Sequence, residues 1–273
     1  MTSTRLTRTL IALGLTVMTG CSDSTATAGT GTLSVRLTDA PIDNVESATV
    51  WISKVYLIGG ADTVSSRVMI SETPAQYNLL SLQNGVTAAL GSAEIPVGTY
   101  TQMRMVVDSA KITLKAPRTF ADGSNSKTLR VPSGQQTGVK VNFATALQIT
   151  PGQTILVADF DVSRSFVVTG PRASPTGASF KPVLHATVTN VAASIAGVVT
   201  PASEKATLAA VTASGDTLAT AVADGVTGAY KLWFLPPGSY TVAAKGTVDG
   251  STFTASRSVT VRAAQDTTGV NLP

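Results

Sequence analysis

The chain has 273 residues with a formal net charge of +4 at pH 7, and its 20 Lys and Arg are dispersed along the sequence. Because these basic residues form no stripe, the charge pattern excludes a nucleic-acid-binding protein. An apolar content of 43% excludes wholesale disorder, and a single cysteine excludes a fold held together by disulfides. We therefore expect a folded protein whose hydrophobic core is sufficient by itself.

Residues 1–20 have the organisation of a secretory signal peptide. Arg5 and Arg8 precede an apolar run over residues 10–18, which is followed by two small residues. The run is too short for a transmembrane helix, which needs roughly 20 apolar residues. We expect this segment to be removed after export.

Cys21 directly follows the small residues of the cleavage site. This arrangement resembles a bacterial lipoprotein signal, whose cysteine is lipidated through sulfur and becomes the first residue of the mature protein. The resemblance implies a membrane anchor at Cys21, and the alternative is an ordinary signal peptide followed by a free cysteine. Ser22, where aspartate would favour the inner membrane, indicates the outer membrane if the organism has one.

Residues 21–31 are small and polar and are expected to form a flexible tether. From Thr32, apolar and polar residues alternate with the period of two that is typical of strands. We predict an all-β, sandwich-like domain over residues 32–190, with a short helical turn only within 76–90 and an exposed loop at 170–179. After the first strand, further strands are predicted at about 47–58, 67–71, 99–108, 110–115, 128–131, 138–143, 153–162 and 181–190.

Residues 192–273 are expected to form a second, smaller β-sandwich, because strand patterns there are short and end in turns every 8–12 residues. The pattern predicts seven strands of Greek-key type, at about 194–200, 206–213, 217–223, 228–234, 239–247, 252–262 and 267–272.

One phrase occurs in both halves of the chain. Residues 95–100 and 235–240 both read apolar-Pro-x-Gly-hydroxyl-Tyr. Proline and glycine favour a tight turn, and we expect Tyr100 and Tyr240 to enter a strand and anchor their hydroxyl groups. The phrase therefore predicts a structural feature and no catalytic role.

The N-terminal half carries several phrases in order: GTLSVRLTDAP at 31–41, YNLL at 77–80, IPVGTYTQMR at 95–104, VPSG at 131–134, TGVK at 137–140 and ADFD at 158–161. Over residues 30–190 it thereby resembles a family of exported bacterial and archaeal domains of unknown function. The resemblance implies a β-sandwich outside the cytoplasm. It implies no activity and no catalytic residues.

The C-terminal half contains TGAYKL at 227–232 and LPPGSYTV at 235–242. Over residues 193–272 it resembles the regulatory-like domain of metallocarboxypeptidases, which has a prealbumin-like, carbohydrate-binding-like sandwich. The resemblance implies an accessory module and no peptidase activity.

Motifs of catalysis are not found in this sequence. The one histidine, His185, lies in a predicted strand, and no Gly-x-Ser-x-Gly elbow presents a nucleophile beside it. A histidine in that position is typical of a hydrogen-bonded sheet residue. We therefore expect no catalytic residues and a protein that is not an enzyme.

Four acidic residues form the remaining candidate site. Asp159 and Asp161 are two apart, so on one strand they share a face, and Asp39 and Asp43 flank a turn. Together their carboxylates can hold Ca²⁺, the one cofactor the sequence suggests. In the alternative, Asp39 bonds the backbone of its turn, and Asp159 and Asp161 are solvated or pair with Arg164.

From these features we expect a non-catalytic, lipid-anchored cell-envelope protein that serves as a binding, docking or spacer module. Its expected partners are the membrane and either a glycan or an envelope protein. One alternative is a glycan-binding lipoprotein with Trp51, Tyr56, Trp233 and Phe234 as candidate platforms, although both tryptophans lie in apolar runs typical of a core. The other is a Ca²⁺-dependent or hydrolytic envelope protein.

Overall fold

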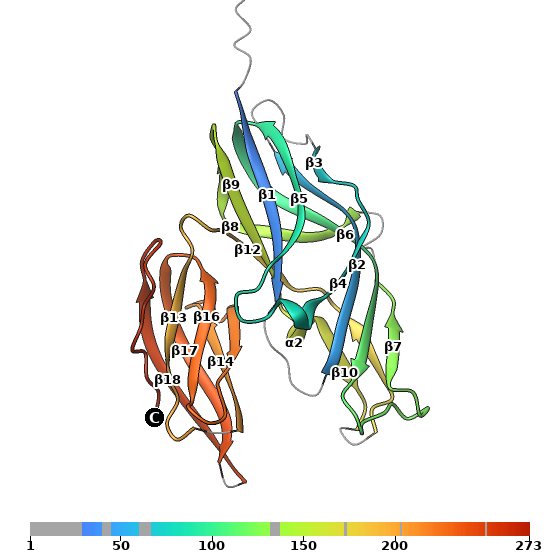
Figure 1. Ribbon diagram of the computed structural model, residues 1–273, viewed down its shortest axis with the longest axis vertical. Helices are drawn as coiled ribbons and strands as arrows, with labels where there is room; N and C mark the ends of the chain where they lie inside the picture. The colour runs from blue at the N-terminus through green and yellow to red at the C-terminus, as the bar shows by residue number, and fades with distance from the viewer. Residues whose placement is uncertain are drawn as a thin grey trace, which may run out of the picture.

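The computed structural model describes residues 29–39, 45–59, 67–131, 137–171, 174–202, 204–248 and 250–273. Most of these residues lie in β-strands, which confirms the all-β prediction (Figure 1). Buried apolar side chains within the described ranges form two separate clusters, one from Leu33 to Leu184 and one from Ala193 to Leu272. We call the parts of the chain around them the N-terminal domain and the C-terminal domain.

The first sheet of the N-terminal domain has the strand order β12-β9-β1-β5. Its strands are β1 (Thr30–Asp39), β5 (Ala88–Pro96), β9 (Gln153–Phe160) and β12 (Leu184–Val188). Strand β1 runs antiparallel to β5 and parallel to β9. The predicted alternation is present, because Leu33, Val35 and Leu37 are fully buried in the core.

The second sheet has the order β3-β2-β6-β7, with β4 also paired to β2 and β8 to β6. Its strands are β2 (Val45–Gly59), β3 (Arg67–Ser71), β4 (Ala75–Asn78), β6 (Gly98–Leu114), β7 (Ser126–Leu129) and β8 (Val139–Ile149). The apolar residues between the two sheets fill the larger core.

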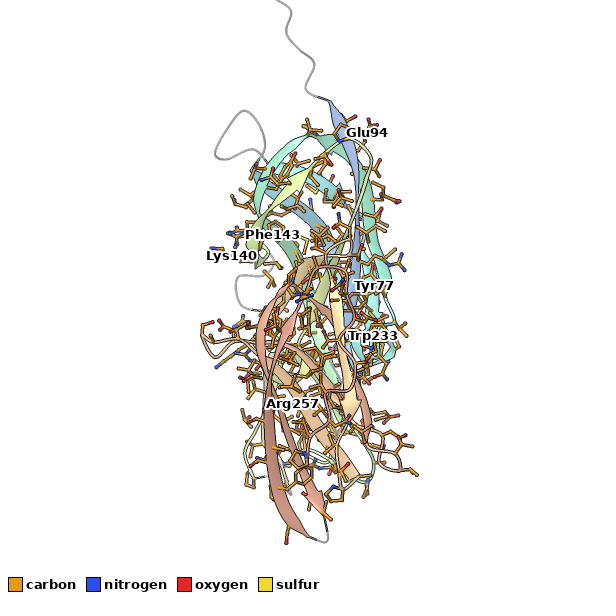
Figure 2. All side chains as sticks on the ribbon, turned by 90° about the vertical axis from the view of Figure 1, so that its left-hand side faces the viewer. Tyr77, Glu94, Lys140, Phe143, Trp233 and Arg257 are labelled. Carbon is orange, nitrogen blue, oxygen red and sulfur yellow. The ribbon has the colours of Figure 1, made fainter. Side chains whose placement is uncertain are left out.

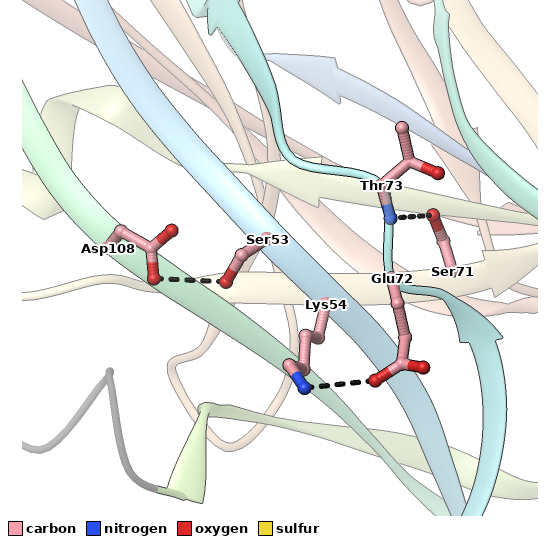
Figure 3. Close-up of polar contacts among 6 residues, drawn as sticks. All are labelled: Ser53, Lys54, Ser71, Glu72, Thr73 and Asp108. Atoms are coloured by element: carbon pink, nitrogen blue, oxygen red, sulfur yellow. Dashed lines mark hydrogen bonds and ion pairs between the residues drawn. The ribbon is translucent and has the colours of Figure 1, made fainter.

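The two strands predicted at 99–108 and 110–115 are one continuous strand, β6. Its pairing with β2 shifts register beside Asp108 and again beside Ser53, so each of these residues is the extra residue of a β-bulge. The extra residue at Asp108 reverses the alternation of buried and exposed residues along β6, and the sequence pattern indicates a break there for that reason. Figure 3 shows that the Ser53 hydroxyl donates a hydrogen bond of 3.0 Å to the Asp108 carboxylate.

Polar contacts around this bulge lie at the surface. The Lys54 ammonium group and the Glu72 carboxylate are 2.9 Å apart, and the two side chains are 49% and 57% exposed (Figure 3). Such an exposed pair adds little to stability, because water screens it. The bulge and its ion pair therefore shape the sheet surface more than they stabilise it.

Three predictions for the rest of this domain need correction or refinement. The expected helical turn within 76–90 is the 3₁₀ helix η1 (Leu79–Leu82), but strands β4 and β5 occupy both ends of that range. The loop expected at 170–179 ends in β11 (Gly177–Phe180), which pairs with β10 (Phe166–Thr169). The strand expected at 153–162 ends at Phe160, and a short helix, α2 (Val162–Ser165), follows.

The C-terminal domain is a small sandwich. Its strands are β13 (Ala193–Val198), β14 (Glu204–Val211), β15 (Thr217–Val222), β16 (Ala229–Leu235), β17 (Gly238–Val248) and β18 (Ser251–Val261). Strands β13 and β16 pair, and a second sheet has the order β15-β14-β17-β18. The predicted strand at 267–272 joins β13 only through isolated parallel bridges, Ile195 to Thr267 and Val199 to Leu272.

The repeated phrase forms the same structure in both domains, as predicted. The Tyr100 hydroxyl donates to the carbonyl oxygen of Pro96 at 2.9 Å, and the Tyr240 hydroxyl donates to that of Pro236 at 2.7 Å. Both tyrosine side chains are buried. Each therefore closes the turn that begins its strand by satisfying a carbonyl that the strand pairing leaves open.

None of the helices that the described residues form is long and apolar enough to cross a membrane.

Candidate functional site at the domain junction

Three polar side chains form a row across the first sheet. In the strand register, Asp159 on β9 pairs with Thr38 on β1 on one side and with His185 on β12 on the other. Residues paired in this way point to the same face of a sheet. The neighbours of Asp159 along β9, Ala158 and Phe160, are in the core. We call Thr38, Asp159 and His185 the polar row, and it faces away from the core of the N-terminal domain.

The C-terminal domain covers the polar row. A cavity of about 40 Å³ is lined by Asp159 and His185 on one side and by Leu218, Phe234 and Pro236 on the other. A second cavity of about 10 Å³ lies against Asp39, Asp159, Thr220 and Trp233. Strands β15 and β16 thus close over a face of the first sheet that would otherwise contact water. The larger cavity has room for a water molecule that bridges Asp159 and His185.

Trp233 makes a close packing contact between the domains. A Cβ atom added to Gly85 would lie 3.0 Å from the Trp233 ring, and Gly85 has a φ of +83° that favours glycine. Figure 2 shows Trp233 where the C-terminal domain meets the N-terminal domain. The next residue, Phe234, also has a positive φ, +54°, which strains the backbone of a bulky residue. The chain is therefore held in an unusual conformation where the domains touch.

Unpaired polar atoms gather at this junction. Among the described residues, five buried side-chain polar atoms have no hydrogen-bond partner, and four of them are Asp39 Oδ2, Asp159 Oδ1, His185 Nε2 and Thr220 Oγ1. Leaving such a group without a partner costs about 1–3 kcal/mol. The concentration of these unpaired groups at one place is the feature of the described residues that most strongly indicates a function.

Burial shifts the titration of these groups toward their neutral forms. Desolvation, helped by the charge of Asp161, raises the pKa of Asp159 from 3.8 to about 7. Desolvation raises the pKa of Asp39 well above its usual value, and the nearby charge of Asp159 adds to this effect. Burial lowers the pKa of His185. The junction therefore disfavours charge of either sign.

Asp161 has a structural role that the sequence spacing did not predict. Because β9 ends at Phe160, Asp161 leaves the strand and caps α2 instead of sharing a strand face with Asp159. Its Oδ1 atom accepts hydrogen bonds from the Ser163 hydroxyl at 2.6 Å and the Arg164 backbone N–H at 3.0 Å. The expected pairing with Arg164 thus involves the backbone of that residue.

Asp39 links β1 to the same short helix. Its Oδ1 atom accepts a hydrogen bond of 3.3 Å from the Val162 backbone N–H. The structure thus brings Asp39, Asp159 and Asp161 near one another, whereas Asp43 lies outside the described residues. Within the described ranges, no three His, Cys, Asp or Glu side chains are arranged to hold a metal ion. The Ca²⁺ site therefore depends on Asp43 and stays a prediction, and Cys21 also lies outside the described residues.

The four aromatic residues considered as glycan platforms have other surroundings. Tyr56 is buried, and its hydroxyl donates to the Thr137 carbonyl oxygen at 2.8 Å. Trp51 is half-buried on β2, and Trp233 and Phe234 line the junction. The Lys231 ammonium group lies 3.8 Å from the centre of the Trp233 ring.

Sequence reasoning did not identify His185 and Thr220 as members of a site. The sequence predicts an ordinary sheet residue at His185, and its place opposite Asp159 follows only from the pairing of β12 with β9. Thr220 comes from the other domain. No local signal in the sequence connects these residues.

The fold defines a two-domain, all-β protein with a polar, buried junction. Residues 30–182, more than half of the chain, match the family described as "Domain of unknown function (DUF4382)", and the chain belongs to this family. The match confirms the resemblance of the N-terminal half to a domain family of unknown function.

Other comparisons add little. No curated protein matches the chain. Among solved structures, "The Bacillus anthracis TIE protein" is similar at 12% sequence identity, over 89% of this chain and 34% of that chain. The TM-score is 0.25, so the likeness carries no argument about fold or function.

Proposed function

We propose that the protein is a non-catalytic, lipid-anchored envelope protein whose two domains form one docking or spacing arm. The observation that carries this proposal is the position of the C-terminal domain relative to the start of β1. Strand β1 begins at one end of the molecule, and the C-terminal domain lies toward the other (Figure 1). An anchor attached ahead of β1 would therefore present the C-terminal domain away from the membrane.

The packing at the junction supports one arm with fixed domains rather than two loosely linked domains. Domains within a chain move relative to each other by default unless their interface is large and apolar. Here Trp233 packs on Gly85, and polar groups of both domains are withdrawn from water. Separating the domains would expose the apolar surface of Trp233, and this contact opposes separation against the cost of the unpaired polar groups.

The same burial supports a non-catalytic role. Asp159 Oδ1 and His185 Nε2 of the polar row could each donate or accept a proton, and both are buried beneath the C-terminal domain. A general acid or base must come within about 3 Å of the proton that it moves. A substrate would have to displace a whole domain to reach either atom.

The anchor in this proposal is Cys21, after removal of residues 1–20. The sequence supports it through the basic residues, the short apolar run and the small residues that precede the cysteine. Two or three acyl chains on one residue exceed the single chain that gives only marginal membrane binding. With Ser22 following Cys21, the outer membrane is the proposed location in an organism that has one.

The C-terminal domain is proposed to be an accessory module of the carboxypeptidase regulatory-like type. Its phrase TGAYKL enters β16 and its phrase LPPGSYTV forms the turn and first half of β17, at the edge that faces the N-terminal domain. Such modules pack against another domain without adding catalysis. Its exposed surface is the part of the arm that an envelope partner would contact.

Cys21→Ala tests the anchor. In cells fed an alkyne fatty acid, the wild-type chain should take the label and sediment with membranes, and the variant should do neither. Ser22→Ala is the matched control and should keep both the label and membrane attachment. A Cys21→Ala chain that stays in the membrane fraction, or a wild-type chain without label, would contradict the proposal.

A further inference from the structure

A groove of about 520 Å³ lies beside the junction. One wall carries Gln148 on β8 and Gln153 on β9, and Asn190 belongs to the segment that joins the domains. The other wall is the turn at Pro236 and Pro237 of the C-terminal domain. The volume is within the range of about 300–1,000 Å³ that is typical of small-ligand sites, which often lie between domains.

The rim of the groove carries uncharged hydrogen-bonding groups. Among the described residues that line it, none is ionisable. Gln148, Gln153 and Asn190 are exposed, and the Oε1 atom of Gln148 accepts a 3.0 Å hydrogen bond from the Thr99 hydroxyl, which orients its amide N–H₂ toward other partners. The side chains of Gln153 and Asn190 bond to no other described residue. Each amide offers both donors and an acceptor.

The floor of the groove is apolar. Phe143 on β8 (Figure 2) and Val188 on β12 are half-buried there, beside the almost fully buried Leu147 and Leu156. Thr187, also buried, adds a hydroxyl group. The groove thus combines an aromatic and aliphatic floor with a rim of amides.

This combination selects among ligand classes. A charged ligand would lose its hydration and find no opposite charge. A purely apolar ligand would cover the rim amides and leave them unpaired, which costs about 1–3 kcal/mol for each group. A sugar ring has an apolar C–H face, which packs on aromatic and aliphatic carbon, and a rim of hydroxyl groups, which pair with amides.

We propose that this groove binds a short, uncharged oligosaccharide. The sugar C–H faces contact Phe143 and Val188, and the hydroxyl groups pair with Gln153 and Asn190 at the rim. The site differs from the four aromatic residues singled out from the sequence. The inference goes beyond the proposed function, because it concerns a ligand and holds whether or not Cys21 is lipidated.

Binding should be measured on the full chain in detergent solution. The probes are uncharged hexasaccharides of α-1,4-glucose, β-1,4-glucose, β-1,4-N-acetylglucosamine and α-1,6-mannose, titrated by calorimetry up to millimolar concentration. We expect at least one to bind, and we expect Gln153→Ala and Asn190→Ala each to weaken that binding about tenfold. Both residues are exposed, so neither substitution should disturb folding.

Gln76→Ala is the matched control, because Gln76 is an exposed amide on β4 of the other sheet. It should leave the affinity unchanged. Absence of binding by all four hexasaccharides overturns the proposal, and so does binding that survives both groove variants. Equal affinity for an oligogalacturonate or for an apolar peptide overturns the assignment to uncharged saccharides. These results leave the test of Cys21 unaffected, so the two proposals fail separately.

Discussion

Asp159 carries a charge that the domain junction accommodates poorly, so Asp159→Asn should stabilise the protein above neutral pH. Asparagine keeps the shape of the side chain and removes its charge. The carboxylate lies on β9 between Thr38 and His185, with Oδ1 buried beneath the C-terminal domain and without a hydrogen-bond partner. Removing a charge from such a site removes a desolvation cost.

The magnitude follows from the pKa of this carboxyl group, which burial raises from 3.8 to about 7. Between these two values the folded state binds more protons than the unfolded state, so the stability that this group contributes is complete below pH 3.8 and is lost as pH rises to about 7. At about 1.4 kcal/mol per pKa unit the full loss is about 4 kcal/mol. Because the asparagine amide also lacks a partner, which costs about 1–3 kcal/mol, we expect a net gain of about 1–3 kcal/mol at alkaline pH.

Urea unfolding at about pH 5 and about pH 8.5, followed by tryptophan fluorescence, measures this difference. The wild type should lose stability between the two conditions, and Asp159→Asn should lose much less. Asp122→Asn is the control: Asp122 is exposed, and its hydrogen bond with Lys127 lowers its pKa to about 2, so its removal should bring no alkaline gain. A wild type equally stable at both pH values, or a variant less stable than the wild type at about pH 8.5, would refute the reasoning.

Three further predictions concern this junction and the candidate Ca²⁺ site. His185 is buried in its neutral form, so the stability it contributes is present above pH 6.5 and is lost as pH falls through its lowered pKa; His185→Gln should remove this acid-side loss in the same urea assay. Gly85→Ala should cost more stability, by about 1–3 kcal/mol, than Gly123→Ala, because both glycines have positive φ but only Gly85 faces the Trp233 ring, whose fluorescence should shift. If the acidic residues bind Ca²⁺, the melting temperature should rise with Ca²⁺ and fall with chelator in the wild type but not in Asp43→Asn; identical melting curves would exclude the site.

The alternation of apolar and polar residues was sufficient to predict most strands of both domains. Leu33, Val35 and Leu37 illustrate why, because each is buried on the same face of β1. The pattern failed where a residue was inserted. At Asp108 the bulge reversed the phase and divided one strand into two predicted ones. Strand β5, with the sequence AALGSAEIP, lacks the β-branched run that marks a strand and was missed for that reason.

The candidate site was less predictable than the fold, because it depends on contacts between distant parts of the chain. Asp39 and Asp159 were chosen from the sequence, and the pairing of β1 with β9 does bring them together. Asp161 was placed on the wrong surface, since the two-residue spacing has meaning only while the strand continues. His185 and Thr220 were found only when the register and the second domain were known.

Strand β1 also determines how the molecule would bear a mechanical load. It is the strand nearest the proposed anchor, and it lies inside its sheet, paired over residues 30–37 with β5 and over residues 32–39 with β9. A pull along β1 would load both ladders in shear, so many hydrogen bonds would have to break together. Strand β18, at the edge of its sheet and paired only with β17 among the described strands, would instead peel away one pair at a time. Under equal tension, β18 should therefore separate from its sheet before β1 does.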